Sequence, residues 1–395
     1  MLATATARLE PDHRATRPIR WNQAPRHEAP GPEDGAVLVS LYLQDPEADK
    51  AIGPQEIAVP SDLVQVRGDR IEGPHFSTVN SRAPRTLAAD EDGNLIFDPH
   101  TPEFDMVSAH VHAEQTVALF EDLLGMDIRW KFGDPRRERV AIRADARHEE
   151  GSHAQLENKR MVLDYYRSNE LGREVRAAES AEIVSHETGH FILHALRPIL
   201  HDTDAETNAF HEAFGDIAAM LYSLQFDANV VRMANETRGD WSRNNIISKF
   251  GEEDGKATQK KHYPDGHTRH DLRSAINDFG YQPPHETPES TTAFSNTVVS
   301  PEVHDFSRIF SGAFYDVLTA LADREVQRGA CLVDAICTAR DRLSEIWAET
   351  IKALPGYYIR FATVAQRMVD ADRDLGGGEV RMLKRIFADR GIATQ

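Results

Sequence analysis

Cysteine is nearly absent from this 395-residue chain, which contains only Cys331 and Cys337. The two lie six positions apart in a segment with helical spacing of apolar residues. They therefore point to different sides of a helix and do not pair. The chain lacks the disulfide framework of small secreted domains, and its cysteine usage gives no sign of an oxidising compartment.

Long apolar runs and an excess of basic residues are missing too. No window of about 18 apolar residues occurs, so we expect no membrane span. Acidic residues outnumber basic ones by 64 to 45, and the net charge of −19 argues against a nucleic-acid partner held through its phosphates. The first twenty residues lack the apolar centre of a secretory signal, so the default expectation is a cytoplasmic protein, with a secreted mature form as the alternative. The sequence indicates no oligomeric state.

The order of patterns along the chain predicts an α+β fold, with strands first and helices later. Residues 1–36, rich in Pro, Arg, Ala and Glu, are expected to form a poorly ordered arm. An N-terminal α+β lobe is predicted over 37–200 and a mainly helical C-terminal lobe over 201–395. Helices are predicted near 103–125, 180–197, 204–226, 303–322, 331–354, 357–376 and 379–391, strands within 36–100, 138–147 and 159–166, and an irregular region with short elements over 228–300.

One of these helices carries the spacing of metal ligands. In "SHETGH", His186 and His190 are one helical turn apart, so their rings can converge on one ion. Glu187 lies beside the open coordination position, where it can take a proton from metal-bound water. The competing interpretation is a chance match, since the chain contains 18 histidines. The position of the motif inside an amphipathic helix favours the metal site.

The third ligand is predicted on the next helix. Glu212 and Asp216 are four residues apart and share one side of an otherwise strongly apolar helix. We expect Glu212 to complete the ligand set and Asp216 to accept a hydrogen bond from the free ring nitrogen of a ligand histidine. His194, a full turn further along its helix, is expected to be a packed or capping residue, and His211 and Glu206 are less favoured as ligands. Two histidines, one glutamate and an open position form the catalytic type of zinc site, so we predict one Zn²⁺.

The two motifs together, "IVSHETGH" followed by "NAFHEAFGDI", resemble the gluzincin metallopeptidases and the thermolysin-like family in particular. Weaker similarities follow in the same order, in "HDLRSAIND", "EVHDFSRIFSGAFYDVL" and the C-terminal helices, so that the resemblance covers about residues 95–391. It implies a two-lobed fold with the zinc site between the lobes. It also implies a zinc-dependent peptidase in which Glu187 is the general base.

The resemblance assigns further site residues. Arg273 is implied to hold a peptide carbonyl of the substrate, and His304 to donate to the tetrahedral oxyanion. Ala154 is implied to lie in an edge strand, near 154–156, that pairs with an extended peptide. Ile183 and Leu272 are implied to wall the pocket for the residue after the cut. We therefore expect an endopeptidase that acts on peptides or proteins and favours a hydrophobic residue at that position.

The sequence departs from the family pattern at several positions. Val299 stands where the family has an aspartate that orients its transition-state histidine, which leaves Glu302 as a candidate for that role. His201 stands near the family's tyrosine donor, and His153 at its substrate-contacting asparagine. Only Glu182 matches the calcium-binding acidic cluster, so calcium is not expected. Two alternatives stay open: a gluzincin aminopeptidase, for which no glutamate motif is seen, and an inactive, metal-stabilised pseudo-protease that serves as a binding module.

Overall fold

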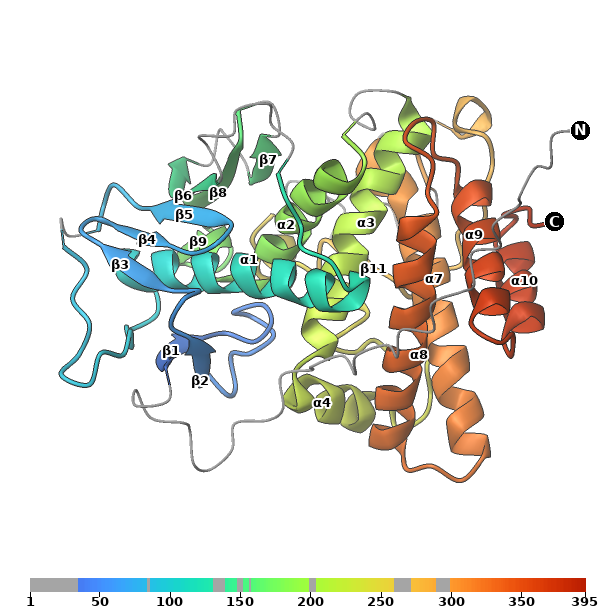
Figure 1. The fold of residues 1–395 in the computed structure, drawn as a ribbon, viewed down its shortest axis with the longest axis horizontal. Helices are drawn as coiled ribbons and strands as arrows, with labels where there is room; N and C mark the ends of the chain where they lie inside the picture. The colour runs from blue at the N-terminus through green and yellow to red at the C-terminus, as the bar shows by residue number, and fades with distance from the viewer. Residues whose placement is uncertain are drawn as a thin grey trace, which may run out of the picture.

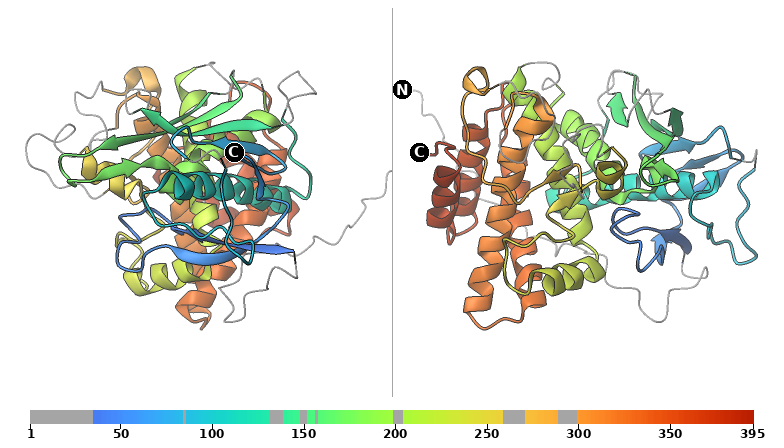
Figure 2. Two further views of the ribbon diagram at one scale, coloured as in Figure 1. Left: turned by 90° about the vertical axis from the view of Figure 1, so that its left-hand side faces the viewer. Right: turned by 180° about the vertical axis from the view of Figure 1, so that it is seen from behind.

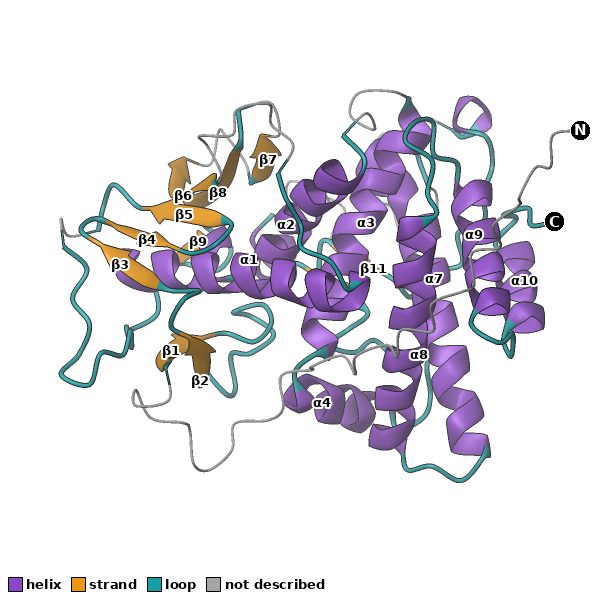
Figure 3. Cartoon of the chain, viewed as in Figure 1, coloured by secondary structure: helices purple, strands orange, loops and turns teal. Residues whose placement is uncertain are grey.

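The computed structural model describes residues 35–83, 86–130, 139–147, 152–155, 158–198, 204–258, 271–288 and 299–395. The predicted arm therefore lies outside the described residues except for its last two positions. About 48% of the chain is helical and 15% is strand, with the strands in the N-terminal part and most helices in the C-terminal part (Figures 1 and 3). The predicted α+β organisation is confirmed.

The N-terminal part contains two sheets on opposite sides of helix α1 (Pro102–Leu124) (Figure 2, left). The larger sheet has the order β3-β4-β5-β6-β8-β7, with β9 also paired to β8. Strands β5, β6 and β8 run parallel to their neighbours in that group, and the other pairs are antiparallel. The strands are β1 Ala36–Leu41, β2 Gln55–Pro60, β3 Gln65–Arg67, β4 Arg70–Glu72, β5 Phe76–Val79, β6 Val140–Arg147, β7 His153–Gln155, β8 Arg160–Arg167 and β9 Glu174–Arg176.

Helix α1 has clear chemical start and stop points. The Thr101 side chain caps its first turn by accepting from the Phe104 N–H, and Pro102 occupies the first helical position. Gly125 ends it in the left-handed conformation, with φ of 65°, as the sequence predicted. Because α1 is covered from both sides, its polar side chains need internal partners. Glu114 accepts hydrogen bonds from two backbone N–H groups at the start of β5.

Helices α2 (Ala181–Leu196) and α3 (Ala205–Leu224) pack against each other between the strand-rich part and the C-terminal helices (Figure 1). A Cβ on Gly189 of α2 would lie 3.0 Å from the Cα of Gly215 on α3. The two glycines therefore permit a close approach of the helix backbones. This contact explains a glycine in mid-helix, where it costs about 1 kcal/mol relative to alanine.

The C-terminal helices are close to those predicted, with three differences, the first being that the helix predicted over 303–322 runs five residues further. They are α7 Val303–Gln327, α8 Leu332–Lys352, α9 Phe361–Asp374 and α10 Val380–Asp389. The helix predicted from residue 357 begins four residues later, because Tyr358 has a φ of 47°, which a right-handed helix does not allow. Helix α4 (Asp227–Thr237) lies inside the region predicted to be irregular, and this part of the prediction was wrong. Its only buried apolar residues are Val230, Met233 and Ala234, and its cap residue Phe226 makes no side-chain cap, so the local pattern was weak.

The remaining elements of that region are short, as expected. They are β10 Lys249–Phe250, α5 Glu252–Ala257, β11 Arg273–Ser274 and the 3₁₀ turn Pro284–Glu286, while a further 3₁₀ turn, Ala177–Glu179, precedes α2. Strands β10 and β11 pair with each other, antiparallel, next to α2 and α3. No helix in the described ranges is long and apolar enough to cross a membrane.

One hydrophobic cluster runs through both predicted lobes. The predicted boundary near residue 200 falls between α2 and α3, whose buried faces belong to this cluster. Aromatic contacts extend it into the C-terminal helices: Phe214 of α3 lies 5.9 Å from Trp347 of α8, and Phe210 lies 5.8 Å from Phe310 of α7, between ring centroids. The two helices that carry the candidate ligands are therefore held on both sides by packed core.

Candidate metal centre

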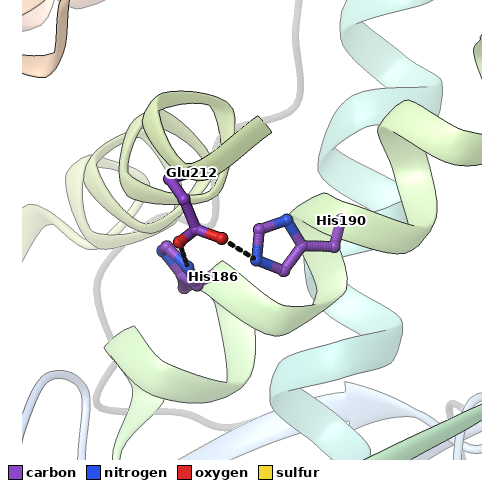
Figure 4. A group of neighbouring side chains, drawn as sticks. All are labelled: His186, His190 and Glu212. Atoms are coloured by element: carbon purple, nitrogen blue, oxygen red, sulfur yellow. Dashed lines mark hydrogen bonds and ion pairs between the residues drawn. The ribbon is translucent and has the colours of Figure 1, made fainter. Parts of the chain in front are cut away.

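The structure brings the three predicted ligands together (Figure 4). His186 and His190 project from α2 and Glu212 from α3, and their ligand atoms all lie within 4.8 Å of one another. The Nε2 atom of His186 is 3.2 Å from Oε2 of Glu212, and Nε2 of His190 is 3.6 Å from Oε1. The two imidazole planes are nearly perpendicular, at 87°. Two imidazole nitrogens and one carboxylate oxygen are the donor set that catalytic zinc sites use.

The pKa shifts of the three side chains indicate that their surroundings favour a cation. Burial alone would lower the pKa of His186, but hydrogen bonds to Asp216 and Glu212 outweigh it and raise that pKa to about 9. Burial holds the pKa of His190 well below its usual value. The pKa of Glu212 lies well below its usual value, because the neighbouring histidines outweigh the effect of burial. The site thus favours a positive charge between its carboxylates, and a divalent ion held by the same three side chains would supply it.

Asp216 occupies the supporting position that the sequence predicted. Its Oδ1 atom lies 3.1 Å from Nδ1 of His186 and accepts a 2.6 Å hydrogen bond from Nη2 of Arg273. The hydroxyl of Ser311 donates to the other oxygen at 3.0 Å. Burial would raise the pKa of Asp216, but Arg273 and His186 bring it down to about 2. The carboxylate can therefore accept a hydrogen bond from the Nδ1–H of His186. This fixes the tautomer in which the Nε2 lone pair faces Glu212.

Glu187 is a buried carboxyl group beside the ligand group. Its Oε2 atom has no hydrogen-bond partner among the described residues, and the side chain is almost fully buried. Burial and the charge of Glu212 raise its pKa to about 7, against the opposing effect of His186. A carboxyl group poised near neutrality can both accept and return a proton.

His304 lies in the first turn of α7 and faces the ligand group. Its Nε2 atom is 3.3 Å from Oε2 of Glu212, while its side chain remains 44% exposed. The Nδ1 atom lies 2.7 Å from Oε1 of Glu302. The other oxygen of Glu302 accepts from the N–H of Asp305 and so caps α7. Glu302 therefore contacts the imidazole as the sequence suggested it could, while Val299 packs against the main hydrophobic cluster.

The predicted substrate-contacting residues are spread over three elements. Ala154 is the middle residue of β7, at the edge of the larger sheet, where it pairs with Met161 of β8. Ile183 is half-buried on α2, and it and Ala154 pack against the main hydrophobic cluster. Leu272 lies outside that cluster, and its side chain covers Gly251. Arg273 is only 5% exposed and is held against Asp216.

Two residues near the ligands were not assigned a role from the sequence. The ring of Phe250 lies 5.2 Å from the ring of His186, and the guanidinium of Arg273 stacks over the same ring at 4.5 Å. Because Phe250 lies in the region predicted to be irregular, no pattern pointed to it. The second residue is His211, considered above only as a ligand, whose Nδ1 atom is 3.0 Å from Nδ1 of His190.

None of the remaining residues considered from the sequence that the structure describes belongs to the ligand group. Glu206 accepts hydrogen bonds from the Tyr281 hydroxyl and the Phe361 N–H, so it supports helix packing away from the ligands. His194 is half-buried in the last turn of α2 and does not belong to the ligand group. His153 contacts Gln155 within β7. His201 and Leu156 lie outside the described residues.

A second group of buried carboxylates lies under the start of α2. Asp45, Glu182 and Glu252 have oxygens within 4.8 Å of one another, and Nζ of Lys249 lies 2.7 Å from Glu252. The sequence indicated only Glu182, because its partners come from segments far away in the chain. The expectation that calcium is absent stays a prediction.

The centre as a whole offers three metal donors, a carboxyl base and an imidazole donor. They come from α2, α3 and α7, which meet at one end of the shared core. A scan against protein-family models finds no match to this chain, and a search of curated proteins finds none either.

Proposed function

We propose that this protein is a zinc-dependent peptidase of the gluzincin type, with the two-lobed thermolysin-like fold. The observation that carries the proposal is the buried carboxyl group of Glu187 beside the three converging donors, with its Oε2 atom unpartnered among the described residues. A site that only stabilises the fold needs no base in that position. The carboxyl group therefore favours hydrolysis over a purely structural role.

His186, His190 and Glu212 would hold the ion, and imidazole with carboxylate donors favours zinc among the common divalent ions. When bound, zinc would polarise the scissile carbonyl and make a water molecule acidic enough to attack it near neutral pH. The close packing of the His186 ring supports its role as a metal ligand, since a Cβ on Gly215 would lie 2.6 Å from its Nδ1 atom. Packing against Gly215 and the contact of Nδ1 with Asp216 together fix the ring.

The chain's own residues move the protons. Glu187 accepts a proton from the attacking water and passes it to the leaving amine, as a buried carboxyl group beside the ligands can. His304 donates from Nε2 to the developing oxyanion, since that atom faces the site and the side chain is partly open to solvent. The contact with Glu302 holds the imidazole in the required orientation.

The edge strand β7 would bind the substrate backbone. Among the described strands it pairs only with β8, so its other edge can accept an extended peptide through main-chain hydrogen bonds near Ala154. Ile183 and Leu272 are apolar and would favour a hydrophobic side chain after the cut. Arg273 would hold a substrate carbonyl, as the resemblance implies, while its Nη2 donates to Asp216.

The test compares the wild type with Glu187→Gln. We expect one zinc per chain in both proteins, casein hydrolysis by the wild type that a chelator abolishes and zinc restores, and nearly complete loss of hydrolysis in the variant. The amide fills the same space but cannot accept the proton. Substantial turnover by the variant would contradict the role of Glu187. Stoichiometric zinc without hydrolysis by the wild type would favour the binding-module alternative.

A further inference from the structure

Each ligand imidazole is contacted on its Nδ1 side by a residue of α3. The partner of His186 is the carboxylate of Asp216, at 3.1 Å. The partner of His190 is the ring of His211, with 3.0 Å between the two Nδ1 atoms and 5.1 Å between the ring centroids. We propose that His211 is the positioning residue of His190, a neutral imidazole that accepts the Nδ1–H of the ligand. The inference rests on the proposed use of His190 as a metal ligand.

The direction of this hydrogen bond follows from the geometry of His190. Its Nε2 atom faces Glu212, so the Nε2 lone pair is the one available to a metal and the ring proton sits on Nδ1. Since His190 is buried, that N–H needs an acceptor. The atom that meets it is Nδ1 of His211, which must then carry a lone pair. His211 is therefore held with its own proton on Nε2, and one contact fixes the tautomers of both rings.

The same geometry excludes His211 as a fourth ligand of this ion. The two nitrogens of an imidazole point away from each other, and His211 approaches the nitrogen of His190 that faces away from Glu212. One ion cannot lie at Nε2 of His190 and at Nδ1 of His211. His211 accordingly acts through His190 and not on the metal.

A neutral acceptor also suits the charge of the centre. Glu212 and Asp216 already place two carboxylates on this side of α3, and Glu187 adds a third acidic group from α2. A further carboxylate at position 211 would add like-charge repulsion in a buried site. The imidazole of His211 orients His190 without that charge. A neutral imidazole polarises the Nδ1–H bond of its ligand less than a carboxylate does. The Nε2 atom of His186, which is backed by Asp216, is therefore more basic than the Nε2 atom of His190.

The test measures zinc affinity in the full chain by competition with a chromophoric chelator. We expect His211→Ala to raise the zinc Kd about 10–100-fold, the usual effect of removing an outer partner of a ligand. His211→Asn should stay within about threefold of the wild type, because its Oδ1 can accept at the position of Nδ1. The Co²⁺-substituted protein should show a shifted visible absorption spectrum in the alanine variant and a wild-type spectrum in the asparagine variant.

A matched control removes another buried histidine. His112 on α1 is fully buried and contacts the Tyr222 hydroxyl at 2.7 Å. His112→Ala should lower stability while leaving the zinc Kd unchanged. An unchanged Kd in His211→Ala, or equal weakening in His211→Asn, would overturn the proposal, because position 211 would then matter only for packing or not at all.

A second measurement covers the case in which the alanine variant does not fold. In the zinc-loaded wild type, ¹⁵N chemical shifts of labelled histidine should show His211 protonated at Nε2 only, and a proton on its Nδ1 would overturn the proposal. Neither measurement reads peptide turnover. If the protein cleaves no peptide but its zinc Kd changes as expected in the His211 variants, the role of His211 stands and the proposed peptidase function fails. If it cleaves peptides but the zinc Kd is unchanged in His211→Ala, the peptidase function stands and the role of His211 fails.

Discussion

Replacing Gly215 by alanine tests whether the close contact between α2 and α3 positions the metal ligands. An added Cβ would lie 2.6 Å from Nδ1, 2.7 Å from Cε1 and 2.9 Å from Cγ of His186. Ordinary contact begins near 3.4 Å, so the ring must move by about 0.8 Å. That displacement is several times the tolerance of about 0.2 Å in ligand distances. We therefore expect the zinc Kd of Gly215→Ala to rise at least tenfold.

The stability of the metal-free protein should fall as well. Alanine gains about 1 kcal/mol over glycine within a helix. Against this gain stand about 1–3 kcal/mol for overpacking and about 1.5–3 kcal/mol for a weakened charged hydrogen bond between His186 and Asp216. The free energy of unfolding should drop by about 1.5–5 kcal/mol, measured by urea denaturation in the presence of a chelator.

Gly312 of α7 provides the control for this substitution. A Cβ there would lie 2.7 Å from Nη1 of Arg390, which is buried, and 2.9 Å from Nδ2 of Asn277, and both are polar groups away from the ligands. Gly312→Ala should therefore also lower the stability through overpacking but leave the zinc Kd unaltered. If Gly215→Ala bound zinc with wild-type affinity and unfolded like the wild type, the packing of His186 against α3 would not constrain the ligand, and the reasoning would fail.

Three further predictions concern the oxyanion donor, the pH dependence of stability and the substrate pocket. His304→Ala should lower kcat about 10²–10³-fold with little change in KM, since a donor used only at the tetrahedral stage acts in this way, and an unchanged kcat would remove His304 from the mechanism. Burial alone would lower the pKa of His75, but Glu114 and Glu121 raise it to about 9 from an unfolded value of 6.5. The resulting stabilisation, up to about 3 kcal/mol, is full below pH 6.5 and is lost as the pH rises through 9, so urea titrations should show a falling stability over this window that disappears in His75→Gln. Digestion of a diverse peptide library should yield new N-termini enriched in Leu, Ile, Val or Phe, whereas Lys, Asp or Gly there would refute the apolar pocket.

Local chemistry made much of the fold predictable. The glycine stop at Gly125 ends α1 as predicted, and apolar periodicity places the long C-terminal helices within a few residues. The spacing of His186, His190 and Glu212 similarly identified the side chains that the structure brings together. A ligand pattern on a helix is a local property, because the helix itself fixes which residues share a side.

What the sequence did not reveal depends on contacts between distant segments. Phe250 reaches His186 only because β10 pairs with β11, 23 residues further along, as the register of Phe250 with Arg273 shows. Asp45 meets Glu182 through the packing of the N-terminal segment under α2. The role of His211 depends on which ring nitrogen faces which neighbour, and a sequence pattern contains no information on side-chain rotamers.

Glu302 links the stability of a helix end to the orientation of the imidazole next to it. One of its oxygens accepts from the N–H of Asp305 at the start of α7, and the other contacts His304 in the same turn. Fraying of that turn would therefore release both contacts in one event. Helix ends open at a lower free energy than the packed core, so the oriented form of His304 would be lost on warming before the protein unfolds. If the protein is the peptidase proposed above, its turnover would then be lost with the melting of a single helical turn, below the temperature of the global transition.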